Sequence, residues 1–111
     1  MQRGKRKGPR MSETKKLDAE QIVLTTNSLA PAYDIKRVYL FGSFVRGTQH
    51  SKSDVDLCLE TGPTFSLFSA GDFAYKLERN LGTEVDIVTE KSCYPHVREK
   101  MLAERKLIYE R

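Results

Sequence analysis

A Gly-Ser pair followed ten residues later by two aspartates constrains the fold of this chain more than any other feature. Residues 41–57 read FGSFVRGTQHSKSDVDL, with the pair at Gly42-Ser43 and the acids at Asp54 and Asp56. RVYLFG, before the pair, and DVDLCLE, which contains the acids, are short and rich in apolar residues, as is typical of strands. The segment therefore predicts a strand that ends at Gly42, a loop, and a second strand that carries Asp54 and Asp56.

The periodicity of the remaining chain places helices around these strands. In the first helix, Leu17, Val23 or Leu24, and Leu29 are expected near one side, and Ser43 is expected to cap a short helical turn. The predicted elements are a helix at 17–30 that ends near Pro31, a strand at 37–42, a helical turn at 43–48, a strand at 54–60, a helix at 69–80 capped by Gly82, a strand at 83–89 and a last helix that begins at Pro95. This α-β-α-β-α-β-α order predicts an α/β (α+β) fold with a small mixed three-stranded sheet flanked by helices.

The basic charge of the chain is concentrated at its N-terminus. The formal net charge is +4, yet residues 1–16 have seven Lys and Arg against one acid, which leaves 12 bases and 14 acids for the rest. Such an arm can bind nucleic acid, but this one has no aromatic residue on which a base could stack. We therefore predict a disordered basic tail at 1–16, without a nucleic-acid partner, and one domain at 17–111.

Neither a membrane segment nor a disulfide framework is predicted. No run approaches the roughly 18 to 20 apolar residues of a membrane span, and no apolar segment follows the basic N-terminus as in a secretory signal. The two cysteines, Cys58 and Cys93, do not have a zinc-binding spacing. Thiols of this kind are typical of a reducing compartment, so the prediction is a cytoplasmic protein.

The two aspartates have the spacing of a metal site. Residues i and i+2 of a strand point to one face with α-carbons roughly 6.5 to 7 Å apart, so Asp54 and Asp56 can converge. Carboxylates held that close repel unless a cation lies between them, and all-oxygen ligands suit Mg²⁺. If the third strand lies beside the second, Asp86 completes a cluster able to hold two metals roughly 3.5 to 4 Å apart.

The Gly-Ser pair has the properties of a phosphate site. Gly42 would let a phosphate approach the backbone, Ser43 could offer its hydroxyl, and the following turn could direct N–H groups at an anion. Arg46 fits a phosphate contact and a surface ion pair equally well. Each feature has an ordinary explanation when it stands alone, as a turn or a solvated strand end, and it is their combination that indicates a site.

GSFVRGTQHSKSDVDL resembles the Gly-Ser-x10-Asp-x-Asp signature of the DNA polymerase β-like nucleotidyltransferase superfamily. The small size, LGTEVDIVT and the Pro-led last helix resemble its minimal nucleotidyltransferase branch, over about residues 17–110. The resemblance implies that Gly42 and Ser43 bind phosphate and that Asp54 and Asp56 bind metal. It also implies that Asp86 ligates the catalytic metal and helps to deprotonate the acceptor.

The same resemblance implies a Mg²⁺-dependent transfer of AMP from ATP to a hydroxyl, with two Mg²⁺ ions. Members of this branch resemble antitoxins encoded with HEPN ribonuclease toxins, and some adenylylate a tyrosine of that toxin. The expected partner is therefore a HEPN-type toxin in a hetero-oligomer. Two alternatives stay open: a non-catalytic antitoxin that neutralises by binding, and a protein that binds or modifies nucleic acid through its basic tail.

Overall fold

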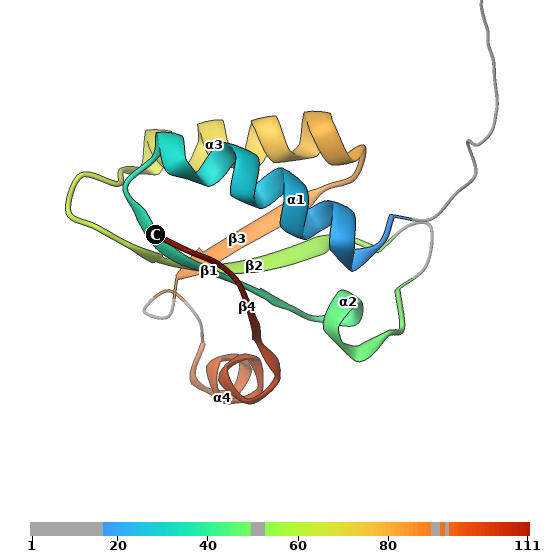
Figure 1. The fold of residues 1–111 in the computed structure, drawn as a ribbon. Helices are drawn as coiled ribbons and strands as arrows, with labels where there is room; N and C mark the ends of the chain where they lie inside the picture. The colour runs from blue at the N-terminus through green and yellow to red at the C-terminus, as the bar shows by residue number, and fades with distance from the viewer. Residues whose placement is uncertain (1–16, 50–52, 90–91, 93) are drawn as a thin grey trace, which may run out of the picture.

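The computed structural model describes residues 17–49, 53–89, 92 and 94–111 (Figure 1). The predicted tail at 1–16 and Cys93 lie outside the described residues. None of the helices in the described part of the chain is long and apolar enough to cross a membrane. The elements are α1 (Ala19–Leu29), a 3-10 turn (Ala30–Ala32), β1 (Ile35–Phe41), α2 (Ser43–Arg46), β2 (Val55–Thr61), α3 (Leu67–Leu81), β3 (Val85–Thr89), α4 (Pro95–Glu104) and β4 (Lys106–Glu110).

The strands form one mixed sheet in the order β3-β2-β1-β4. β1 is antiparallel to both β2 and β4, whereas β2 and β3 are parallel. The predicted mixed α/β fold is thus confirmed, but the predicted number of three strands is wrong. The fourth strand, KLIYE, is too short to show a pattern of its own, and it is a strand because Val38 pairs with Tyr109 and Leu40 with Lys106.

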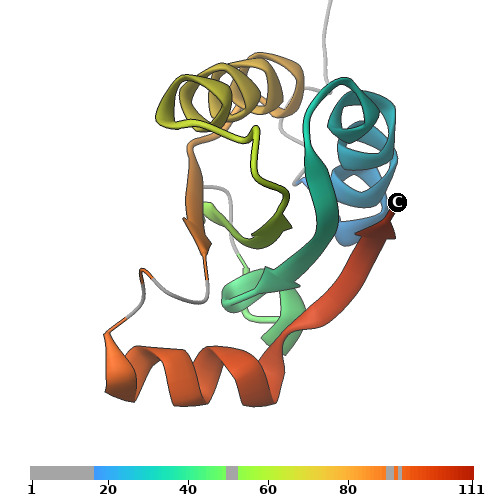
Figure 2. The same ribbon diagram turned by 90° about the vertical axis from the view of Figure 1, so that its left-hand side faces the viewer.

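The helices lie on both sides of this sheet. Figures 1 and 2 show α1 and α3 against one face and α4 on the opposite side. The hydrophobic core lies between this face and the two helices α1 and α3. Alternate residues of the strands pack there against residues of the helices: Val38, Leu40, Val55, Leu57 and Leu59 from the strands, and Ile22, Phe73 and Leu77 from the helices. Since neighbouring residues of a strand point to opposite faces, Phe41 and Asp56 project toward the side of α4.

The helix ends follow local sequence signals, whereas the buried face of α1 does not. α3 begins after a capping box between Ser66 and Ser69 and ends at Gly82, which has a φ of 72°. In α1 the buried residues are Ile22 and Thr26, and Leu24 is 63% exposed. Of the expected residues, Leu17 and Leu29 pack against the core, and of the alternatives Val23 and Leu24, Leu24 does not belong to the buried face. Ile22 was not expected there, because the contact with the sheet decides which side of the helix is buried.

The loop before β1 is held by Asp34. Its carboxylate accepts hydrogen bonds from the Thr64 N–H and hydroxyl, both at 2.8 Å, and from the Arg111 guanidinium at 2.9 Å. These bonds, that of Arg111 foremost, lower the pKa of Asp34 to about 2. A Cβ at Gly62 would overlap the same carboxylate, so the glycine allows this close packing.

We expect Asp34→Asn to lower the urea concentration at which the protein unfolds at pH 7. A carboxylate with a lowered pKa stabilises the fold above its unfolded value of 3.8, and this stabilisation is lost as the pH falls toward 2. The variant should therefore lose less stability than the unaltered protein between pH 4 and pH 2. Asp18→Asn is the matched control, since Asn caps α1 as well as Asp does. Equal acid sensitivity of both variants would contradict the prediction.

Candidate active site

The Gly-Ser pair lies where β1 turns into α2. Gly42 has a φ of 82° and a ψ of −152°, a conformation that is essentially restricted to glycine. Its carbonyl accepts hydrogen bonds from the N–H groups of Val45 and Arg46, both at 3.1 Å. Gly42 is therefore the N-cap of α2, and the expectation that Ser43 is the cap is wrong. Among the described residues, none accepts a hydrogen bond from the N–H of Ser43 or Phe44, so both can serve an incoming anion.

The sheet register brings the two halves of the motif together. Asp56 of β2 pairs with Phe41, the last residue of β1, and with Asp86 of the parallel strand β3. A Cβ at Gly42 would overlap the carboxylate of Asp56. The expectation that the third strand lies beside the second is confirmed. Gly42, directly after β1, lies against Asp56 of β2, which is paired with Asp86 of β3.

The three carboxylates differ in their surroundings. Asp56 is partly buried, whereas Asp54, just before β2, and Asp86 are exposed. Burial foremost, together with the charges of Asp86 and Asp54, raises the pKa of Asp56 to about 6, against a lowering by the charge of Arg46. Among the described side chains, no set of three His, Cys, Asp or Glu is already arranged to hold a metal ion. The donor set nevertheless fits a hard divalent cation, because it is all oxygen and its mutual repulsion would be relieved by one.

Helix α4 supplies the second wall of the site. A cavity of about 310 Å³ lies between the end of β1 and α4, and it contains Gly42 and Asp56. Its α4 side consists of residues at helical spacing that the sequence analysis did not assign to the site: His96, Val97, Lys100, Met101 and Glu104. Their i, i+4 recurrence is visible in the sequence, but only the fold shows that this stripe lines the same cavity as Asp56, which Asp54 and Asp86 do not line.

Arg46 is placed at the site but already has a partner. Its guanidinium donates to the Glu104 carboxylate at 3.0 Å, which links α2 to the last turn of α4. Arg46 also lines the cavity and lies close enough to lower the pKa of Asp56. Of the two roles expected for Arg46, a phosphate contact or an ion pair, the structure shows the ion pair.

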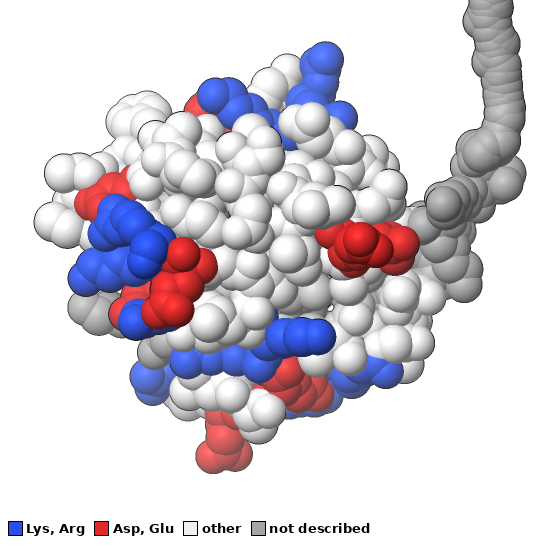
Figure 3. All heavy atoms as spheres, in the orientation of Figure 1, with Lys and Arg blue, Asp and Glu red and all other residues white. Residues whose placement is uncertain are grey.

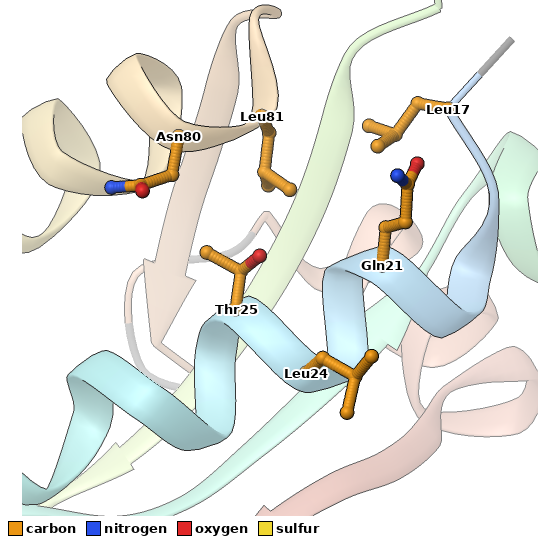
Figure 4. Close-up of a pocket in the computed structure, with 6 residues that line it drawn as sticks. All are labelled: Leu17, Gln21, Leu24, Thr25, Asn80 and Leu81. Carbon is orange, nitrogen blue, oxygen red and sulfur yellow. The ribbon is translucent and has the colours of Figure 1, made fainter. Parts of the chain in front are cut away.

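A second cavity, of about 190 Å³, lies between α1 and α3 (Figure 4). It is lined by uncharged residues only: Leu17, Gln21, Leu24, Thr25, Asn80 and Leu81. On the face in Figure 3, acidic side chains lie beside many of the basic ones in the described part of the chain. The described residues that line this cavity include no acidic or basic group for catalysis, and the mixed charges of the described residues form no separate binding patch on this face.

The chain matches the family model for polymerase β nucleotidyltransferases over residues 24–111. A candidate protein adenylyltransferase of Methanocaldococcus jannaschii is 38% identical over 72 residues, which cover 65% of this chain and 77% of that protein. A solved structure of a candidate minimal nucleotidyltransferase is similar with a TM-score of 0.72 at 30% identity, over 86% of this chain and 98% of that one.

Two solved toxin-antitoxin structures are also similar. One, a toxin-antitoxin with AMP-PNP, has a TM-score of 0.65 at 26% identity, over 83% of this chain and 73% of that one. The other is a complex of a tri-AMPylated HEPN toxin of Shewanella oneidensis with an MNT antitoxin. It has a TM-score of 0.57 at 20% identity, over 79% of this chain and 71% of that one, and its likeness shows the fold alone.

Proposed function

The chain belongs to the polymerase β nucleotidyltransferase family, and from this premise we propose that it transfers AMP from ATP to a tyrosine hydroxyl of a HEPN-type toxin. It would thereby act as the antitoxin of a toxin–antitoxin pair, in a complex with that toxin. The observation that carries the proposal is the row of Gly42, Asp56 and Asp86 across the ends of three neighbouring strands. The adenylyltransferase named among the relatives and the toxin-antitoxin with AMP-PNP support the choice of AMP and of a protein acceptor.

The nucleotide would bind between the Gly-Ser turn and the aspartates. The hydroxyl of Ser43 and the backbone N–H groups of Ser43 and Phe44 are available to phosphate oxygens. Gly42 leaves room for these oxygens because it has no side chain. Asp54, Asp56 and Asp86 would hold the Mg²⁺ ions, two by analogy with the family. Bound Mg²⁺ would neutralise the charge that develops on the phosphates and lower the pKa of the acceptor hydroxyl.

In the reaction, the acceptor oxygen forms a bond to the α-phosphorus, and the bond from that phosphorus to the bridging oxygen of the β-phosphate breaks. Pyrophosphate leaves, and the acceptor proton passes to the Asp86 carboxylate and from there to water. Asp86 suits this role because it is exposed and lies on β3, an edge strand of the sheet. A hydroxyl that belongs to another protein can reach it from that open side.

The wider organisation is part of the same proposal. Residues 17–111 would act as one nucleotidyltransferase domain, because every described helix and strand except α4 contributes to one core, and β4, which follows α4, is paired with β1. The basic segment 1–16 would be an appendage to it. A reducing cytoplasm suits the buried thiol of Cys58 and is the compartment we propose.

The proposal is tested by incubating the protein and the product of the adjacent gene, if that is a HEPN-type protein, with Mg²⁺ and ATP labelled at either the α- or the γ-phosphate. Label on the toxin from α-labelled but not γ-labelled ATP, with release of pyrophosphate, is the expected result. Label from the γ-position would instead identify a kinase. A stable complex that silences the toxin without any label would overturn the proposal in favour of an antitoxin that acts by binding.

Mg²⁺ binding should depend on pH near pH 6. The pKa of Asp56 is raised to about 6, so below that value a proton competes with the metal and the affinity should fall about tenfold per pH unit. The stability of the metal-free protein should show the opposite trend with pH. Its folded state binds more protons than its unfolded state between pH 3.8 and 6, so its stability should decline as the pH rises through that window.

Both trends can be measured on one protein, by Mn²⁺ titration followed by electron paramagnetic resonance and by urea unfolding in EDTA. Asp56→Asn should flatten the pH dependence of stability, because it has no proton to lose at this position. A metal affinity that is constant between pH 5 and pH 7 would contradict the assignment of Asp56 as a ligand.

A further inference from the structure

Lys100 on α4 faces the nucleotide site from the side opposite the Gly-Ser turn. We propose that Lys100 binds the β- and γ-phosphates of the nucleotide and the pyrophosphate that leaves. The inference rests on the proposed function, and it names a phosphate-binding residue outside the Gly-Ser and Asp-x-Asp motif.

The position of Lys100 follows from the cavity and from the spacing of α4. Lys100 lines the same cavity of about 310 Å³ as Gly42 and Asp56. Its neighbours one turn away on the helix, His96 and Glu104, line that cavity too, so this face of α4 is directed at the site. Met101, which follows Lys100, is the only buried residue of α4 and anchors the helix to the rest of the protein.

The charges of the cavity single out Lys100. Arg46 is paired with Glu104 at 3.0 Å, so the charges of these two residues largely cancel. Within the described part of the chain, Lys100 has no ion pair or hydrogen bond, although it lines a cavity that also contains the carboxylate of Asp56. His96, which also lines the cavity, stacks on Tyr94 with 6.3 Å between the ring centroids.

A single ammonium on a long flexible stem suits the end of a triphosphate chain. The aspartates and the metal they hold would engage the α-phosphate, where the bond changes occur, and the remaining phosphates would extend toward α4. Lys acts as a point charge that can follow an anion as it moves. Negative charge grows on the pyrophosphate as it leaves, so the attraction to Lys100 is stronger during the reaction than before it.

The test measures equilibrium binding of inorganic tripolyphosphate and of AMP, each with Mg²⁺, by calorimetry. Lys100→Ala should raise the dissociation constant for tripolyphosphate about tenfold or more and change that for AMP less than twofold. Lys100→Arg should retain most of the affinity. Lys36→Ala, which removes an exposed lysine near the start of β1, is the matched control and should bind like the unaltered protein.

The outcomes separate this inference from the proposed function. A tripolyphosphate affinity that is the same in Lys100→Ala and in Lys36→Ala overturns the inference, even if AMP transfer proceeds. Weaker binding with a shallower salt dependence in Lys100→Ala supports it, even if no AMP reaches the toxin. Equal losses for AMP and tripolyphosphate would show a disturbed helix and also overturn it, and thermal melting of each variant checks the fold.

Discussion

Asp56→Asn should reduce AMP transfer about a thousandfold while leaving the protein folded and no less stable. Asp56 is the only one of the three carboxylates that is partly buried, and it lies in register with both Phe41 and Asp86. Its removal would take away one of the three proposed metal ligands. The same change removes a charge that burial and two neighbouring acids disfavour, as its raised pKa of about 6 shows. Activity and stability should therefore move in different directions.

The measurement is a single-turnover rate of label transfer at saturating Mg²⁺, combined with thermal unfolding of the same preparation. Asp18→Asn is the matched control, because it makes the same chemical change at the N-cap of α1, a position that accepts Asn. A rate within tenfold of that of the unaltered protein would contradict a role of Asp56 at the centre of the reaction. A large loss of stability would show that the carboxylate is structural.

Gly42→Ala should abolish measurable transfer and destabilise the fold by about 2 to 3 kcal/mol. Two separate penalties apply at this position. The backbone has a φ of 82° and a ψ of −152°, which a residue with a Cβ avoids, and the added methyl would overlap the Asp56 carboxylate. The second penalty would act directly on the proposed metal site, because the Asp56 carboxylate has to turn away.

Gly47→Ala separates the two penalties. Gly47 has a φ of 76°, but a Cβ there would meet no atom within 4 Å. This variant should lose only about 1 kcal/mol and retain transfer. The double change Gly42→Ala with Asp56→Ala adds a further check: the glycine substitution should destabilise the fold less once the carboxylate is gone. Equal destabilisation by Gly42→Ala in both backgrounds would contradict the overlap.

Local patterns were sufficient to predict much of this molecule. The capped ends of α3, the three predicted strands and the end of α1 before Pro31 all lie close to where the sequence places them. These features depend on residues near one another in the chain, through alternation, capping and the geometry of proline. The family followed from the same kind of signal, since Gly-Ser and Asp-x-Asp stand at a fixed spacing within 15 residues.

The errors share a different cause. The fourth strand forms because it pairs with β1. Leu24 is exposed because the packing of α1 on the sheet buries another side of the helix. Gly42 caps α2 because its backbone, with a φ of 82°, turns the chain sharply after β1. The α4 wall with Lys100 was missed for the same reason, because its residues follow the motif by about 40 positions. In each case the deciding partner is distant in sequence.

The sequence by itself therefore determined most of the elements, the family and which acids are candidate metal ligands, because each of these depends on side-chain chemistry and spacing along one segment. Only the tertiary structure decided how the acids meet. The parallel pairing of β2 with β3 puts Asp86 beside Asp56, the turn after β1 puts Gly42 against the same carboxylate, and α4 closes the cavity with Lys100. The physical reason is that strand pairing and helix packing are set by which apolar faces can be buried together, a property of the whole chain.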